Sequence, residues 1–68
     1  MVNLEELKKE IADSGMTMVA IAKKSGISRV TLYNRLDGVG EFTASEIVGI
    51  SSALHLSKPR REEIFFTR

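Results

Sequence analysis

Four side chains with complementary chemistry lie close together in the middle of the chain, at positions 29, 30, 33 and 34. On a helix, residues four apart lie one above the other, so Arg29 stands over Tyr33 and Val30 over Asn34. Together these side chains offer hydrogen-bond donors, acceptors and one apolar contact. Such groups recognise base edges in a major groove. The spacing therefore predicts a helix with one face suited to double-stranded DNA.

The segment that contains these residues has the composition of two short helices joined by a tight turn. Thr17 and Ser28 are good N-caps for the two helices. Gly26 permits a positive φ at the end of the first helix, and the small Ala22 allows close packing of the second. The predicted inward side of this unit consists of apolar residues, namely Ile21, Ala22, Ile27, Leu32 and Leu36.

Three more helices are predicted, and each follows a residue that caps helix N-termini: Asn3, Thr43 or Ser57. Glu6 and Glu46 come three residues after the first two of these caps, which is the spacing of a capping box. No stretch alternates apolar and polar residues long enough to form a strand. The sequence of 68 residues therefore predicts a single all-α domain of five helices.

The segment from Thr17 to Gly38 resembles the helix-turn-helix of the bacteriophage Cro and repressor family, also called the xenobiotic-response-element family. Phe42-Thr43-Ala44-Ser45-Glu46-Ile47 and Ile64-Phe65-Phe66 resemble segments of its small Cro-like members. This resemblance covers nearly the whole chain. It implies a compact five-helix bundle of the phage-repressor DNA-binding type, with the helix-turn-helix formed by the second and third helices. It also implies a cytoplasmic repressor in a bacterial host cell, which occupies an operator in a phage or prophage switch.

The resemblance also assigns DNA contacts residue by residue. The base-facing positions are Ser28, Arg29, Val30, Tyr33 and Asn34. Thr17 falls where a hydroxyl and backbone amides hold phosphate. Apart from the resemblance, the basic residues Lys24 and Arg35 either contact phosphate beside this site or form a solvated flank. Two departures weaken the expected binding. Met18 stands where the family often has glutamine, and the loop over residues 38–41 has no basic residue.

The three consecutive apolar residues Ile64, Phe65 and Phe66 predict a protein interface near the C-terminus. Each step along a helix turns by about 100°, so all three cannot be buried on one side. We expect one or two to pack in the core and the remainder to form an exposed patch. A symmetric homodimer through this patch would place two recognition helices about 34 Å apart. The alternative is a monomer in which both rings complete the core.

Composition argues against other classes of function. The chain has no cysteine and one histidine, His55, so it lacks the ligands of a thiolate metal site or of a zinc site. The adjacent carboxylates Glu62 and Glu63 point about 100° apart and cannot act as an acid–base pair. We therefore expect no enzyme activity, cofactor, metal or membrane span. The small net charge of +1 keeps a second function open, an antirepressor or modulator that binds a partner repressor.

Overall fold

The computed structural model describes residues 1–66 and contains five α-helices and no strand among them. The helices are α1 (Leu4–Ser14), α2 (Met18–Ser25), α3 (Arg29–Leu36), α4 (Ala44–Ala53) and α5 (Lys58–Phe65). The structure is compact, with extents of 29 × 24 × 20 Å. The prediction of an all-α fold with five helices is therefore confirmed. None of the helices in the described part of the chain is long and apolar enough to cross a bilayer.

Every helix begins at the capping residue that the sequence predicts. In each case the cap side chain accepts a hydrogen bond from the backbone N–H three residues later, which satisfies one of the free amides of the first turn. The five caps are Asn3, Thr17, Ser28, Thr43 and Ser57. These bonds are local, so the sequence alone is enough to place the helix starts.

The two predicted capping boxes have different outcomes. At α4 the box is complete, because Glu46 Oε1 accepts the Thr43 N–H at 3.0 Å. At α1 only half of it forms. The Asn3 N–H donates instead to the carbonyl oxygen of Ile64 at 2.7 Å. The Glu6 carboxylate accepts from Arg60 Nη2, also at 2.7 Å. The prediction of a full box at α1 is therefore wrong, because α5 packs beside α1 and supplies other partners.

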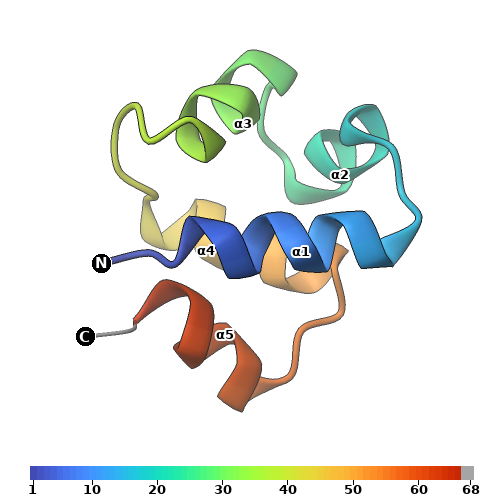
Figure 1. Ribbon diagram of the computed structural model, residues 1–68. Coiled ribbons are helices and arrows are strands. Elements are labelled where there is room, and N and C mark those ends of the chain that lie inside the picture. The colour runs from blue at the N-terminus through green and yellow to red at the C-terminus, as the bar shows by residue number, and fades with distance from the viewer. Residues whose placement is uncertain (67–68) are drawn as a thin grey trace.

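The helices surround one hydrophobic core to which each contributes one fully buried side chain. In Figure 1, α2 and α3 lie together on one side of the molecule, α1 and α4 occupy the middle, and α5 lies on the opposite side. The fully buried side chains are Leu7, Ile21, Leu32, Ile50 and Ile64. Burying one such side chain stabilises the fold by about 1.5–3 kcal/mol. The predicted core residues of α2 and α3 are buried as expected, whereas Ile27 in the turn is only half-buried.

The packing of α2 against α4 depends on Gly49, a glycine inside a helix that no motif in the sequence marks. A Cβ at this position would overlap the carbonyl oxygen of Ser25 and would lie 3.1 Å from its carbonyl carbon. The backbone at the end of α2 therefore touches the backbone of α4. Only a residue without a side chain allows this approach.

The helix α4 ends in a left-handed turn that contains no glycine. His55 has φ +55°, and its N–H donates to Ser52 O at 3.2 Å. The next residue, Leu56, donates to Ser51 O at 2.9 Å. These are the two bonds of a Schellman motif, in which glycine usually occupies the position of His55. His55 is exposed and lies just beyond the end of α4.

Candidate nucleic-acid interface

The turn between α2 and α3 has the local geometry that the sequence predicts. Gly26 has φ +75°, and its N–H donates to Lys23 O at 3.3 Å. The Ile27 N–H donates to Ala22 O at 3.1 Å, which closes the end of α2. Ser28 then begins α3 as its cap. Two residues separate the cap of α3 from the last residue of α2, so the two helices are held closely together in space (Figure 1).

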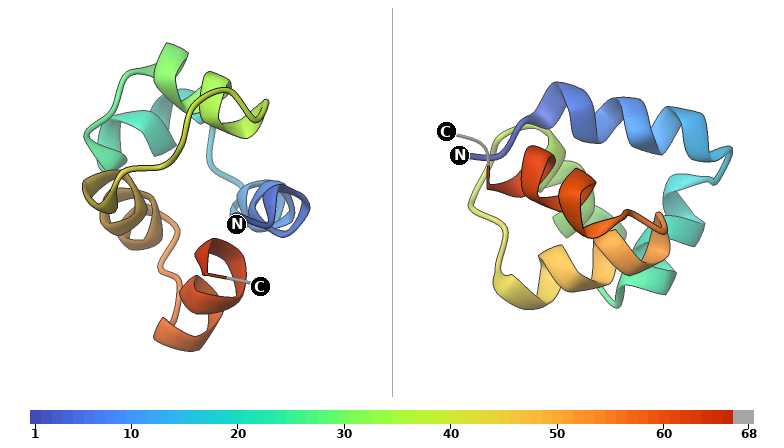
Figure 2. Two further views of the ribbon diagram at one scale, coloured as in Figure 1. Left: turned by 90° about the vertical axis from the view of Figure 1, so that its left-hand side faces the viewer. Right: turned by 90° about the horizontal axis from the view of Figure 1, so that it is seen from below.

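The outer side of α3 carries the four residues that the spacing predicts to face outward. Val30 is 69% exposed and Tyr33 is 48% exposed. Arg29 and Asn34 are exposed as well. Figure 2 (left) shows α3 at the edge of the molecule. Helices α4 and α5 both lie on its inner side. These side chains are therefore accessible to a large ligand.

The inner side of the same helix is fixed in the core by Leu32 and Leu36, which are 0% and 7% exposed. They lie one turn apart and alternate with the outward residues along the helix. Because the two leucines anchor α3 from below, the side chains on its outer face have a defined direction. The two leucines therefore fix which side of α3 faces outward.

The two predicted hydroxyl contacts, Thr17 and Ser28, are both exposed but are used in capping. Thr17 Oγ1 accepts from the Ala20 N–H at 3.1 Å. Ser28 Oγ accepts from the Thr31 N–H at 3.0 Å and donates to Thr31 Oγ1 at 2.9 Å. Thr31 was not among the predicted site residues. The first backbone amides of α2 and α3 have no partner within their helices, so these N-termini can receive phosphate oxygens.

The predicted flanking cations, Lys24 and Arg35, lie in different environments. Lys24 is exposed in the last turn of α2, beside the exposed Lys23. Arg35 is half-buried, and its Nε donates to Glu46 Oε1 at 3.1 Å. Its Nη1 donates to Val39 O at 3.2 Å. In this structure the Arg35 guanidinium is therefore engaged by α4 and the preceding loop.

The partner of Arg35 is the buried carboxylate of Glu46. Burial by itself raises the pKa of this carboxyl. The hydrogen bonds from the Thr43 amide and from Arg35 outweigh this effect, so the pKa lies below its ordinary value. Glu46 is therefore ionised at neutral pH, and it balances the charge of Arg35. The other three cations of residues 21–40, Lys23, Lys24 and Arg29, have exposed side chains.

The three apolar residues near the C-terminus divide as the helical geometry predicts. Ile64 is fully buried and Phe65 is 3% exposed, whereas Phe66 is 58% exposed. The Phe65 ring packs edge-to-face on Phe42, with the ring centroids 5.4 Å apart. Ile64 and Phe65 therefore belong to the core of the monomer. Of the predicted interface, only Phe66 lies on the surface.

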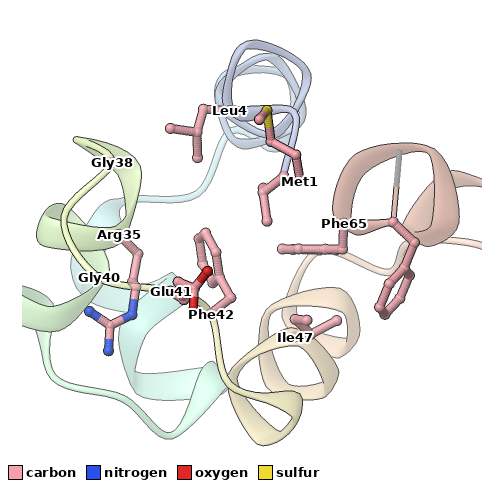
Figure 3. Close-up of a pocket in the computed structure, with 11 residues that line it drawn as sticks. Met1, Leu4, Arg35, Gly38, Gly40, Glu41, Phe42, Ile47 and Phe65 are labelled. Carbon is pink, nitrogen blue, oxygen red and sulfur yellow. The ribbon is translucent and has the colours of Figure 1, made fainter. Parts of the chain in front are cut away.

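Phe66 borders a cavity of about 440 Å³ that the sequence did not predict. Figure 3 shows that residues from the start of the chain, the loop after α3, α4 and the end of α5 line it. Its wall is mostly apolar and includes Met1, Leu4, Phe42, Ile47 and Phe65. Phe66 also borders a second hollow, which is lined by Ala44, Val48 and Arg61. These residues come from distant parts of the chain, so only the tertiary structure brings them together.

Comparisons with protein-family models, with curated proteins and with solved structures find no match to this chain. A function for the α3 face must therefore be argued from the chemistry and the exposure of its own residues. The face combines one arginine, one asparagine, a tyrosine hydroxyl and a valine methyl surface on a rigid helix. This arrangement is suited to contact a surface that carries both hydrogen-bonding and apolar groups.

Proposed function

We propose that this protein binds double-stranded DNA through the outer face of α3 and acts as a Cro-like helix-turn-helix repressor of a phage or prophage switch. The observation that carries the proposal is the exposure of Arg29, Val30, Tyr33 and Asn34 on one side of a helix whose other side is anchored in the core. The resemblance of residues 17–38 to the helix-turn-helix of phage regulators supports the same function.

The dimensions and chemistry of α3 suit a major groove. A helix with its side chains is about 10–12 Å in diameter, and the major groove is about 12 Å wide. In such a complex Arg29 would donate two hydrogen bonds to a guanine, and the amide of Asn34 would pair with an adenine. Val30 would contact a thymine methyl group. Each good bidentate contact contributes about 1–3 kcal/mol of discrimination between base pairs.

Backbone contacts would position the helix on the duplex. The N-terminus of α2, capped by Thr17, offers free amides and the positive end of the helix dipole to a phosphate. Lys23 and Lys24 can add one or two further contacts from the same helix. Each phosphate contact contributes about 0.9 to the salt dependence of binding. With so few cations the affinity of one monomer is modest, which favours binding as a dimer.

The proposed dimer uses Phe66, the exposed member of the C-terminal apolar group. Phe66 and Val48 are 58% and 60% exposed and border the same hollow. In a two-fold symmetric pair the same surface of each copy would contact the other. Two α3 helices could then bind half-sites one helical turn apart, and operator occupancy would block transcription from an overlapping promoter.

The experiment that tests the proposal is selection of duplexes from a random library, followed by affinity measurements on the selected and a scrambled duplex. We expect one sequence class to be enriched. We expect Arg29→Ala to weaken binding to the selected duplex by about 1–3 kcal/mol and to relax preference at one base pair. Lys8→Ala removes the same charge from the exposed side of α1 and should have little effect. Failure of the wild type to enrich any sequence would overturn the proposal.

A second candidate function is favoured by the exposed apolar pair Val48 and Phe66 and by the small net charge of +1. In this case the protein would bind a partner repressor and modulate it. An electrophoretic shift with the DNA upstream of the gene separates the two functions. Run with and without the neighbouring regulator, it should show a shift by this protein alone if it is a repressor. A modulator would shift nothing alone and would change the shift caused by the regulator.

A further inference from the structure

The C-terminal end of α3 is connected to α4 by one group of polar contacts around Arg35. Its Nε donates to Glu46 Oε1 at 3.1 Å, and its Nη2 approaches Oε2 at 3.5 Å. The Arg35 and Glu46 side chains are 20% and 11% exposed, so water screens the pair only in part. A pair with two contacts fixes the relative orientation of its partners better than a single point contact does.

The loop between α3 and α4 is built around the same guanidinium. Arg35 Nη1 donates to Val39 O at 3.2 Å. Gly40 has φ +76°, and a Cβ there would overlap Arg35 Nη1 and lie 3.1 Å from Cζ. Glycine therefore permits both the backbone conformation and the close approach of the arginine.

One carboxylate oxygen accepts hydrogen bonds from both α3 and the start of α4. Glu46 Oε1 accepts from Arg35 at the end of α3 and from the Thr43 N–H at the start of α4. The last turn of α3 and the first turn of α4 are thereby tied to a single buried group. The other end of α3 is held by the short turn from α2. A helix of only eight residues held at both ends has little freedom to tilt.

We propose that Arg35 and Glu46 are a positioning pair that sets the tilt of α3, and with it the ability of Arg29, Tyr33 and Asn34 to discriminate among base pairs. This inference rests on the proposed DNA-binding function. It replaces the expected role of Arg35 as a phosphate contact. Arg35 acts through the helix and does not touch the DNA.

The two roles of Arg35 predict opposite effects of the substitution Glu46→Gln. Glutamine at this position can still complete the capping box of α4, so the helix start is retained. If Arg35 were a phosphate contact, removing its buried partner would free one positive charge and tighten binding to any duplex. If the pair positions α3, the same substitution weakens binding to the selected duplex, although it makes the protein more positive.

The experiment measures the affinity for the selected and the scrambled duplex with Glu46→Gln, Arg35→Gln and the double variant. All are compared at a temperature where circular dichroism shows them folded. Ile64→Val, buried in α5, serves as a control with a comparable loss of stability. We expect either single substitution to weaken binding to the selected duplex about tenfold, as loss of one charged hydrogen bond would. The control should retain the wild-type preference.

The double variant and the salt dependence complete the test. We expect the double variant to bind like the single variants, because each single substitution already removes the charged pairing of Arg35 with Glu46. The salt dependence should stay that of the wild type. Tighter binding by Glu46→Gln, or a salt slope lower by about 0.9 in Arg35→Gln, would overturn the inference.

Amide hydrogen exchange in the free protein makes the inference independent of DNA binding. Both single substitutions should accelerate exchange of the amides over residues 37–39, which bond to the last turn of α3, more than Ile64→Val does. Unchanged exchange there would refute the positioning pair, whatever the protein binds. Accelerated exchange in a protein that binds no duplex would leave the pair standing and refute only the proposed function.

Discussion

Gly49→Ala gives the sharpest test of how α2 is seated, because two effects of opposite sign meet at this position. In an exposed helix, replacing glycine by alanine stabilises by about 1 kcal/mol. Here the new methyl group would overlap the backbone carbonyl oxygen of Ser25 and would lie 3.2 Å from its Cα. Backbone atoms cannot rotate away as a side chain can, so α2 and α4 must move apart. Overpacking of this kind costs about 1–3 kcal/mol, and the loss of packing between the helices adds to it.

We expect a net loss of about 1–2 kcal/mol of unfolding free energy for Gly49→Ala. Urea denaturation followed by far-UV circular dichroism measures it. Ser52→Ala, at an exposed position of the same helix, introduces alanine without overpacking and should be neutral or slightly stabilising. Because α2 carries α3 through a short turn, the variant should also bind the selected duplex more weakly. A Gly49→Ala protein as stable as the wild type would refute the close approach of the two backbones.

Three further predictions concern the end of α4, the exposed C-terminal ring and the buried carboxylate. His55→Gly should raise the unfolding free energy by about 0.5–1 kcal/mol, because glycine adopts φ +55° without strain. Thermal denaturation measures this change, and a lower stability of the variant would contradict the prediction. In sedimentation equilibrium, Phe66→Ala should convert the proposed dimer to a monomer. Val19→Ala, at another exposed apolar position, should leave the dimer intact. A wild type that stays monomeric at high concentration would refute the dimer. The pKa of Glu46 is lower in the folded protein than the ordinary glutamate pKa of 4.5, so the ionised carboxylate stabilises the fold at pH values above 4.5. This stabilisation is lost as the pH falls through the lower pKa of the folded state. Urea denaturation of wild type and Glu46→Gln across that range should show the difference between them shrinking as the pH falls, and a constant difference would contradict the assignment.

The helix starts and the direction of α3 could be predicted because both depend on contacts within a few residues. A cap hydroxyl such as that of Ser28 reaches an amide only three positions away. The outward direction of Arg29 and Tyr33 follows from the helical repeat once Leu32 is assigned to the core. The accessible face of the candidate interface was therefore available from the sequence alone.

The interactions of Arg35, Glu6 and Phe66 were not available in this way. The sequence around Arg35 is that of a basic segment. It does not distinguish an arginine that contacts phosphate from one that pairs with Glu46. Glu6 occupies a capping-box position, yet its carboxylate accepts from Arg60, fifty-four positions away in the chain. The helical repeat predicts that not all of three consecutive apolar residues are buried. It does not say which of them faces outward.

The sequence by itself determined where the helices begin, which side of α3 is apolar and which side chains remain for a ligand, since these are properties of local backbone geometry and the helical period. The tertiary structure alone decided which long charged side chains pair, where two backbones touch at Gly49, and which aromatic ring stays exposed. Flexible side chains have many partners within reach until the helices pack. Packing fixes the distances between residues far apart in the chain, and those distances select one partner among them.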